Sequence, residues 1–455
     1  MMILKGHHRM NVTSSWSKIE GEIQPDSVTI LAAALHSVDP KEAVMSGLRK
    51  LDRKITFKPG RRVGLVSMGK AAVPMASGLL EQYADRIASG LVVAKVLPEQ
   101  QATQLSKMKV LIGNHPVPGV RSVFAGEEII RYLSGFGNGD MVFCLISGGA
   151  SALVAKPFPH ISLDDLRDTT GLLLDCGASI DEINVIRKHL DEIKGGRLAA
   201  ACGESACVSL ILSDVLGDRL DVIASGPTVP DKSTYQDALR IIEKYQLTNH
   251  VPISIMELFR KGVIGQAPET PKPGDRVFDD KQTILVGSLK IAMEAALEKA
   301  RELGYSAEMI YPLLTGEARE VGERLAAFLK SKAGENKTDG CRRCWIAGGE
   351  STVTIRGCGI GGRNQELALA AVRGLDGVKG ATLITFATDG EDGRSPAAGA
   401  VVTGDTLRRA VERGLDPDQY LLNNDSHTFF KALNSAIITG STGTNVNDLV
   451  VLLLD

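Results

Sequence analysis

The chain has 455 residues, of which 44% are hydrophobic and 23% charged, as is typical of a globular protein with more than one domain. A formal net charge of −2 and an aromatic content of 4% argue against nucleic acid or an anionic membrane surface as a partner. No apolar run approaches the ~20 residues that span a bilayer, and no secretory leader is recognisable. We therefore expect a cytoplasmic protein with no membrane partner.

The first part of the chain predicts alternating helices and strands. A helical pattern extends from Pro25 to about Leu51. Strands are expected at 62–67, 91–96, 110–113, 141–147 and 208–213, with helices at 69–84, 122–133 and 235–245. This alternation is typical of parallel α/β layers.

A segment rich in proline and glycine, 265–275, is the predicted linker. A second α/β series is expected from 283 onward. It comprises helices at 288–303, 317–332 and 364–373 and strands at 283–286, 307–311, 344–347, 353–356, 382–387 and 449–454. The predicted domains are therefore 26–270 and 283–455, and the predicted fold class is α/β.

Two copies of one pattern, each an apolar run followed by Gly-Gly-x-Ser, stand 200 residues apart. Glycine allows sharp turns and close approach of the backbone to a ligand, and a serine adds a hydroxyl. Such turns can bind phosphate or carboxylate oxygens, although each copy alone could be an ordinary glycine turn. The candidate binding residues are Gly148, Gly149 and Ser151 in the first copy and Gly348, Gly349, Glu350 and Ser351 in the second.

Polar residues that follow other predicted strands are further candidates. Lys70 comes directly after the strand at 62–67, where open α/β sheets bind ligands, and its ammonium could neutralise a phosphate. His115 lies in a rigid turn and could be a base, although a structural turn explains it as well. Asp214 and Asp218 follow the strand at 208–213 and could hold a hard cation or cap the chain.

The second half adds three loops of this kind. Residues 357–362 match G-x-G-x-x-G between a predicted strand and a predicted helix, but no well-placed acidic residue follows to bind a ribose. The alternative is a loop that presents Arg363, which suits carboxylate or phosphate, together with Asn364. Asp389 is a third candidate metal ligand, and Asn445 lies in a hydroxyl-rich turn that could bind an anion.

The combined set contains anion-binding turns, a lysine, an arginine and several carboxylates. No G-x-S-x-G or H-E-x-x-H motif is present, so a serine hydrolase or a zinc protease of those types is not indicated. Phosphoryl transfer needs cations that neutralise phosphate charge, a magnesium site and a means of holding the acceptor. The sequence therefore favours a phosphotransferase.

Several motifs together resemble the glycerate 2-kinase family, from about residue 26 to the end. In chain order they read MGKAA, GNHPVPG, LISGGASAL, INVIRKHLDEIKGGRLA, LSDVLGDRLDVIASGPTVPD, GGESTV, GGRNQELALA, ATDGEDG, AAGA and TGTNVNDL. The resemblance implies a Rossmann-like N-terminal domain, a smaller C-terminal MOFRL-type domain and an active site in the interdomain cleft. It implies ATP-dependent phosphorylation of D-glycerate to 2-phosphoglycerate with Mg²⁺.

The family's lysine, arginine and glutamate fall on Lys70, Arg363 and Glu350. We expect Lys70, Arg363 and Asp214 to be catalytic, and Asp214, Asp218 and Asp389 to be the candidate metal ligands. The sequence does not decide which aspartate acts as base, and it leaves the oligomeric state open, a homodimer included. An NAD(P)H-dependent hydroxypyruvate reductase is the alternative function, and a non-catalytic sensor of small molecules is a third.

Overall fold

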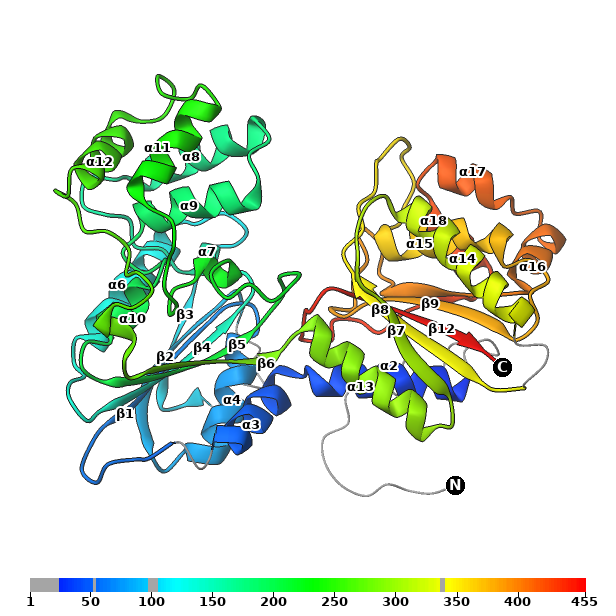
Figure 1. Ribbon diagram of the computed structural model, residues 1–455, viewed down its shortest axis with the longest axis horizontal. Coiled ribbons are helices and arrows are strands. Elements are labelled where there is room, and N and C mark those ends of the chain that lie inside the picture. Colours follow the sequence, from blue (N-terminus) through cyan, green and yellow to red (C-terminus); the bar gives the residue numbers. More distant parts are fainter. Residues whose placement is uncertain (1–23, 52–54, 97–104, 336–339) are drawn as a thin grey trace. The chain divides into compact units, whose positions relative to one another are not determined.

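The computed structural model describes residues 24–51, 55–96, 105–335 and 340–455, and these form two compact units. One unit is continuous and covers Pro40–Val286. The other combines the chain up to Asp39 with Gly287–Asp455. Each unit is built from helices packed on a β-sheet, which confirms the predicted α/β class (Figure 1).

The helix predicted from Pro25 to Leu51 is two helices that belong to different units. Helix α2 covers Pro25–Ser37 and α3 covers Pro40–Leu51. Pro40 lacks a backbone N–H and disfavours helical geometry at the residue before it, which explains the break. Helix α2 packs against α13 (Leu289–Glu302), which lies in the second half of the sequence (Figure 1).

Polar contacts fix α2 to this discontinuous unit. The Asp26 carboxylate accepts hydrogen bonds from Arg342 at 2.6 Å and from the Tyr305 hydroxyl at 3.3 Å. Just after the helix, the Val38 carbonyl accepts a hydrogen bond from the Thr444 hydroxyl at 2.7 Å. The compact units therefore differ from the predicted domains, which placed the first helix with residues 26–270.

The segment predicted as a linker, 265–275, is instead part of the continuous unit. Thr270 is only 1% exposed, the Pro268 carbonyl accepts a hydrogen bond from Arg197, and the Pro271 carbonyl accepts one from the Asp231 N–H. Its prolines stiffen an extended segment that packs on the domain surface. The next strand, β6, is accordingly the last strand of the first sheet and does not open the second one.

The continuous unit contains a six-stranded sheet with the strand order β3-β2-β1-β4-β5-β6. The pairs that join β3, β2, β1, β4 and β5 are parallel. The strand order reverses between β1 and β4, because β2 and β3 are added on one side of β1 and β4 to β6 on the other. Strands β1 and β4 are almost fully buried, as expected for central parallel strands. The bounds are β1 Val63–Met68, β2 Ile87–Ala94, β3 Met108–Ile112, β4 Met141–Ser147, β5 Ala206–Leu212 and β6 Lys281–Gly287.

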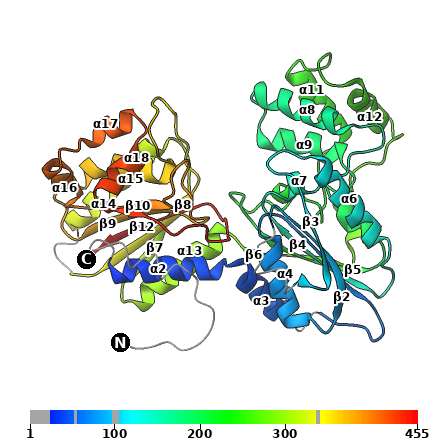
Figure 2. The same ribbon diagram turned by 180° about the vertical axis from the view of Figure 1, so that it is seen from behind.

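Helices α3 and α4 cover one face of this sheet, and α6 and α10 cover the other (Figure 1). A second group of helices, α8, α9, α11 and α12, lies together (Figure 2), and buried side chains from these helices form a separate hydrophobic core. The bounds are α4 Ala72–Tyr83, α6 Val120–Leu133, α7 Ala150–Leu153, α8 Leu163–Asp175, α9 Ile180–Leu190, α10 Arg197–Ala201, α11 Tyr235–Lys244 and α12 Ile253–Val263, with short 3₁₀ turns η2 at Ile223–Ser225 and η3 at Arg276–Phe278.

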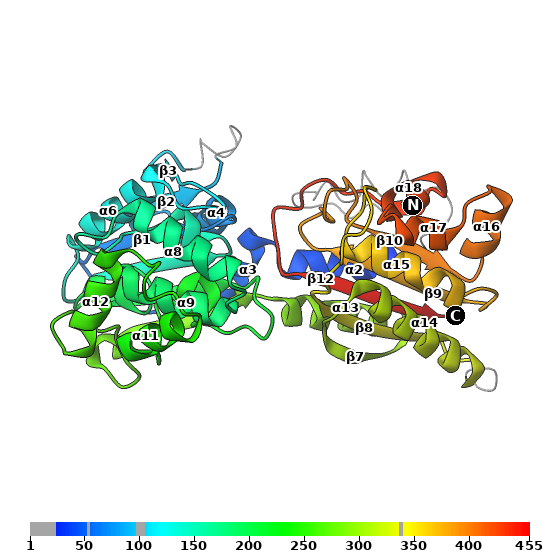
Figure 3. The same ribbon diagram turned by 90° about the horizontal axis from the view of Figure 1, so that it is seen from above.

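The discontinuous unit has a mixed sheet with the order β11-β10-β9-β12-β8-β7, in which only the β7–β8 pair is parallel. Helices α2 and α13 cover one face, and α14 and α15 cover the other, with α15 over β9 and β10 (Figure 3). The predicted strand at 353–356 is not formed. The bounds are β7 Ser306–Leu314, α14 Ala318–Glu335, β8 Arg343–Gly349, α15 Arg363–Gly374, β9 Ala381–Ala387, β10 Gly399–Thr403, α16 Thr406–Glu412, α17 Pro417–Leu422, α18 Ser426–Ala432, β11 Ala436–Ile437 and β12 Asp448–Leu454.

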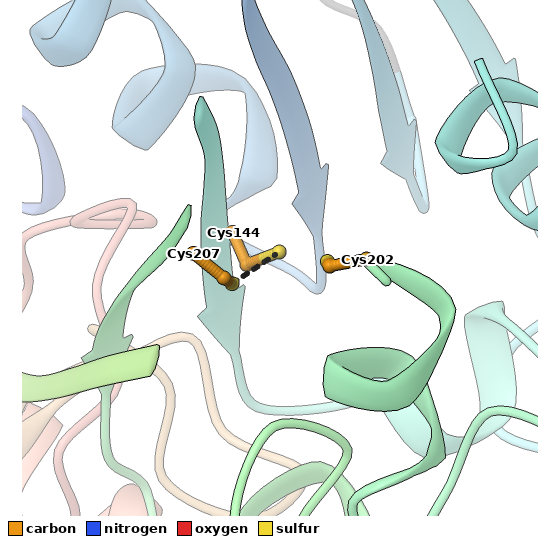
Figure 4. Close-up of side chains that lie close together, drawn as sticks. All are labelled: Cys144, Cys202 and Cys207. Atoms are coloured by element: carbon orange, nitrogen blue, oxygen red, sulfur yellow. Dashed lines mark hydrogen bonds between the residues drawn. The ribbon is translucent and has the colours of Figure 1, made fainter. Parts of the chain in front are cut away.

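Three cysteines converge inside the continuous unit, on the face that α6 and α10 cover (Figure 4). The Cys207 and Cys144 sulfurs are 3.6 Å apart, and Cys202 lies beside them. Contacts with the other two thiols, together with burial, raise the pKa of Cys144, so this thiol stays protonated at neutral pH. The thiols pack as small apolar groups.

In the part of the chain that the structure covers, no helix has the length and apolar content needed to cross a bilayer.

Thiol reactivity follows from this packing. All seven cysteines are described and none forms a disulfide; Cys341 and Cys358 are exposed, while Cys144, Cys202, Cys207 and Cys344 are buried. Because a reagent reaches only accessible thiols, we expect Cys341 and Cys358 to react fast with Ellman's reagent in the native protein and the buried thiols to react only after unfolding. Fast reaction of a Cys341→Ser, Cys358→Ser double variant at a buried cysteine would contradict the packing.

Candidate functional site

The first site lies at the carboxyl ends of β1 and β4, where the strand order of the parallel sheet reverses. Open α/β sheets bind their ligands at this position. The Lys70 N–H donates to the Gly148 carbonyl at 2.9 Å, and the Ala71 N–H donates to the Ser147 hydroxyl at 3.0 Å. Gly69 has φ +126°, and a methyl group there would lie 2.2 Å from the Ser147 hydroxyl. Only glycine fits, and the two loops are held together.

The side chains of Lys70 and His115 meet over Gly149. An added methyl group on Gly149 would lie 3.1 Å from both Lys70 Cγ and His115 Nε2. Lys70 is exposed, and its ammonium has no hydrogen bond or ion pair with any described residue. Burial, and then the charges of Lys70 and Lys95, lower the pKa of His115, so its imidazole is neutral at pH 7.

Asp214 completes this cluster from the end of β5. A methyl group on Gly148 would lie 1.8 Å from an Asp214 carboxylate oxygen, so the carboxylate lies directly against the glycine turn. Asp218 follows in the same loop with a left-handed backbone, φ +54°. The structure therefore brings together four of the predicted site residues, Lys70, Gly148, Gly149 and Asp214. His115, for which the sequence left a base and a structural turn as alternatives, lies beside them.

A chain of hydroxyl groups connects the first glycine turn to helix α9. The Ser151 and Ser225 hydroxyls are 2.8 Å apart, and Ser225 donates to the Asn184 side chain at 3.0 Å. Ser225 is buried and has φ +60°, an uncommon conformation for a residue with a side chain. Ser151 was predicted as a binding residue, and its hydroxyl is fixed by this network.

The second site lies in the discontinuous unit, around Arg363 at the start of α15. Its guanidinium bonds to both carboxylate oxygens of Asp448, at 2.5 and 3.2 Å, and to Glu350. Burial raises the pKa of Asp448 to about 6, although the arginine opposes this shift. Arg363 is therefore a cation that already holds two carboxylates, which its sequence position did not reveal. Asp448 is a candidate that the sequence analysis missed, although it directly precedes a predicted strand.

The second Gly-Gly-x-Ser copy does not form the predicted turn. Gly348 and Gly349 are the last residues of β8, are buried, and pair with Leu449 and Asp448 of β12. A methyl group on Gly349 would lie 2.1 Å from the Leu314 carbonyl oxygen. These glycines permit close packing of strands, so the interpretation of both copies as anion-binding turns is wrong for 348–349.

The G-x-G-x-x-G match does not follow a strand, so the structure removes the context that a dinucleotide fingerprint needs. Its glycines pack closely on neighbouring chain: a methyl group on Gly357 would lie 2.4 Å from the Asn423 carbonyl oxygen. At the helix start, the Asp392 carboxylate accepts hydrogen bonds from the Asn364 and Gln365 N–H groups, at 2.9 and 2.8 Å. Asn364 is buried, and Asp392, another missed residue, caps α15.

Asp389 and Asn445 are neighbours in the discontinuous unit, with the Asn445 amide 3.3 Å from the Asp389 carboxylate. Ser351 is buried and Glu350 is exposed in the same unit. The three predicted metal ligands are thus divided, since Asp214 and Asp218 belong to the continuous unit. Across the described ranges, the cysteine cluster is the one group of three histidine, cysteine or acidic side chains with metal-compatible spacing.

Comparison with known proteins covers nearly the whole chain. Residues 26–260 match a family described as a domain of unknown function (DUF4147), and residues 343–448 match the MOFRL family. The D-glycerate 2-kinase of Thermotoga maritima is 39% identical over 94% of this chain and 97% of its own length. The chain belongs to the glycerate 2-kinase family. The resemblance seen in the sequence motifs is confirmed.

Structural comparison agrees with the family. The crystal structure of a glycerate kinase from Thermotoga maritima superposes with a TM-score of 0.84 at 38% identity, and covers 95% of this chain and 100% of that one. A relative from Agrobacterium vitis, 38% identical over 93% of each chain, is named provisionally as a hydroxypyruvate reductase. That name supports a reductase less strongly than the other names support a glycerate 2-kinase. The glycine loop at 357–362 gives the reductase no further support, because it does not follow a strand.

Proposed function

We propose that this protein transfers the γ-phosphoryl group of ATP to the 2-hydroxyl of D-glycerate and releases 2-phosphoglycerate and ADP. Membership of the glycerate 2-kinase family supports the reaction class. The observation that carries the proposal is the convergence of three features at the strand-order reversal of the parallel sheet. They are a lysine with no partner among the described residues, a tight Gly-Gly turn and an aspartate. Phosphoryl transfer needs such positioning and charge neutralisation more than it needs a strong base.

In the continuous unit, Lys70 would neutralise charge on the transferred phosphoryl group. The Gly148–Gly149 turn leaves no side chain between the backbone and a phosphate, so phosphate oxygens can approach closely. Asp214 offers a partly buried carboxylate beside that turn, the type of oxygen ligand that Mg²⁺ prefers. Asp214, with Asp218 in the same loop, would hold the ion, and bound Mg²⁺ would supply further neutralisation of phosphate charge.

In the discontinuous unit, Arg363 would act together with its carboxylates. Two of its five N–H donors are not used by Asp448 and Glu350 and can bind a substrate oxygen. Asp448 has a pKa of about 6, so it is mostly ionised at pH 7 and can accept a proton from a hydroxyl that is losing one. We assign it the orienting or proton-accepting role for which the sequence offered Asp214 or Asp389.

The decisive experiment measures ADP release with D-glycerate, ATP and Mg²⁺, and identifies the product by phosphorus NMR. We expect steady turnover and a phosphorus resonance of 2-phosphoglycerate. Chelation of Mg²⁺ by EDTA should abolish turnover, and added Mg²⁺ should restore it, because the triphosphate charge would otherwise repel the attacking oxygen. Absence of ADP release, or a 3-phosphoglycerate product, would contradict the proposal.

A parallel assay tests the alternative reaction. Incubation with hydroxypyruvate and NADH or NADPH should give no oxidation of the nucleotide, because the glycine loop at 357–362 does not follow a strand. Oxidation of NADH that depends on hydroxypyruvate would instead favour the reductase.

A further inference from the structure

A cavity of about 530 Å³ opens beside the first glycine turn, within the continuous unit. This volume falls in the range of small-molecule sites. Its lining includes three residues of the site described above, His115, Gly149 and Ser151, and it extends to helices α8 and α9, where it reaches Arg187. The cavity is thus continuous with the proposed phosphate-binding turn.

Arg187 differs from the other cations that line this cavity. The Lys194 ammonium bonds to Asp191 at 2.5 Å, and the Arg167 guanidinium donates to the Pro118 carbonyl at 3.0 Å. Arg187 has no hydrogen bond or ion pair with any residue that the structure describes. Its guanidinium is the lining cation that remains available to a ligand.

The same contrast holds along helix α9 itself. The next two residues both have protein partners: Lys188 pairs with Asp231 at 3.1 Å, and His189 contacts Glu269 at 2.9 Å. These neighbours face the interior of the unit and are buried. Arg187 is half-buried, faces the cavity and has no such partner in the part of the chain that the structure describes.

The position of Arg187 is fixed by the hydroxyl network already described. Asn184 lies one turn earlier on α9 and, through Ser225, is connected to Ser151 in the turn after β4. Residues three apart lie on the same side of a helix. The network therefore holds the side of α9 that carries Arg187 against the glycine turn.

The surroundings of the guanidinium favour an anionic partner. Burial lowers the pKa of Arg187, and no carboxylate among the described residues offsets this loss of hydration. Apolar residues also line the cavity, among them Leu166, Ala152 and Ala155, and they strengthen electrostatic attraction there by lowering the local polarity. An anion bound to Arg187 would offset the cost of desolvation, whereas an empty cavity would not.

We propose that Arg187 binds an anionic oxygen group of a substrate in this cavity, either the carboxylate of glycerate or a phosphate of the nucleotide. The identity of these ligands rests on the proposed kinase function. A planar guanidinium suits both groups because it can donate two parallel hydrogen bonds to a pair of oxygens. The unpaired Arg187 satisfies this requirement more simply than Arg363, which already holds two carboxylates.

The test compares Arg187→Gln and Arg187→Lys with the wild type in steady-state kinetics, with each substrate varied in turn. We expect Arg187→Gln to raise the KM of one substrate by about 10-fold or more, the effect of losing a hydrogen bond to a charged group, with a smaller change in kcat. A raised KM for D-glycerate identifies the carboxylate as the ligand, and a raised KM for ATP identifies a phosphate. Arg187→Lys should give an intermediate KM, because lysine keeps the positive charge but lacks the two parallel N–H donors of the guanidinium.

Thermal unfolding separates this inference from the kinase proposal. ADP or D-glycerate should raise the unfolding temperature of the wild type, and Arg187→Gln should lose the increase for one of them while the free variant stays as stable as the wild type. This readout does not need turnover, so it can support the site even if phosphorylation of glycerate fails. Arg240→Gln, an exposed arginine of α11 outside the cavity, is the control. Unchanged KM values and ligand-induced shifts in Arg187→Gln, or no shift in the wild type with either ligand, would overturn the inference.

Discussion

Replacement of Lys70 by alanine is expected to lower turnover by ~10²-fold or more, the typical loss when one electrostatic stabiliser of a transition state is removed. The Lys70 side chain passes beside the Gly149 turn, and its ammonium has no partner among the described residues, so its charge is available to a phosphoryl group. Because the side chain is exposed and unpaired, the free energy of unfolding should change by no more than about 0.5 kcal/mol. Coupled ADP-release kinetics and urea unfolding on the same preparation measure both quantities.

The matched control for Lys70 is Lys95→Ala. Lys95 is also exposed and contributes to the electric field at His115, but it does not belong to the glycine-turn cluster. We expect this control to retain turnover. If Lys70→Ala kept near-normal turnover, or if both variants lost it equally, Lys70 would have no specific role in the reaction.

Replacement of Arg363 by alanine is expected to impair both turnover and stability. The variant leaves Asp448 buried without its cation, and the loss of one partner of such a pair costs about 3 kcal/mol of unfolding free energy at pH 8. Turnover should fall by ~10²-fold or more, because the proposed substrate-orienting group is lost. Urea unfolding across a pH series, together with coupled assays at saturating substrate, measures both effects.

The sign of the pH dependence follows from Asp448. Its pKa in the folded protein is raised to about 6 by burial, above its value in the unfolded chain. The folded state therefore binds more protons between these pKa values, and the stability contribution of this group is lost as pH rises through the folded pKa. Arg363 opposes this shift, so the pKa of Asp448 in the folded Arg363→Ala variant should rise further. The loss of unfolding free energy relative to the wild type should therefore be small at pH 5, where Asp448 is mostly protonated in both folded proteins, and large at pH 8.

A double variant, Arg363→Ala with Asp448→Asn, tests whether the stability loss comes from the unpaired Asp448 carboxylate. It removes the titrating carboxylate, so stability at pH 8 should recover, while turnover stays low because both proposed functional groups are absent. A stability deficit in Arg363→Ala that does not vary with pH would contradict the pairing with Asp448. Near-normal turnover would exclude Arg363 from the mechanism.

The sequence predicted the strands and the reaction class better than the unit boundaries. Buried central strands such as β1, β4 and β9 are continuous apolar runs, and these are readable without a structure. The boundary between the two units at Asp39–Pro40 could not be read from the sequence, because two helices joined by only two residues have nearly the same periodicity as one long helix. Pro40 was the available signal. Conversely, the prolines of 265–275 suggested a linker, although rigid segments also pack against a domain.

Similar sequence did not imply similar conformation at the glycine motifs. Gly149 adopts a left-handed turn with φ +80°, whereas Gly349 continues a buried strand. The difference comes from the neighbouring strands: β12 pairs with β8 through Gly348 and Gly349, whereas the pairing of β4 with β1 and β5 ends at Ile146 and Ser147, before the glycines. Periodicity and composition carry no information about such pairing partners.

The pairing state of charged side chains was the other property that the sequence could not supply. Arg363 and Arg187 both lie in motifs of the family, yet one holds two carboxylates and the other has no partner among the described residues. Asp448 and Asp392 were missed for the same reason, because their roles depend on residues dozens of positions away. Only the tertiary structure distinguishes an occupied cation from an available one.

The interrupted chain path of the discontinuous unit has a consequence for synthesis on the ribosome. Helix α2 is made early, but its packing partner α13 emerges only after all of Pro40–Val286 has been translated. At a translation rate of ~5–20 residues per second, the apolar face of α2 remains unpacked for tens of seconds until α13 is synthesised. The inserted unit can complete its own fold during this delay, so chaperone binding to the newborn protein is expected to concentrate on α2.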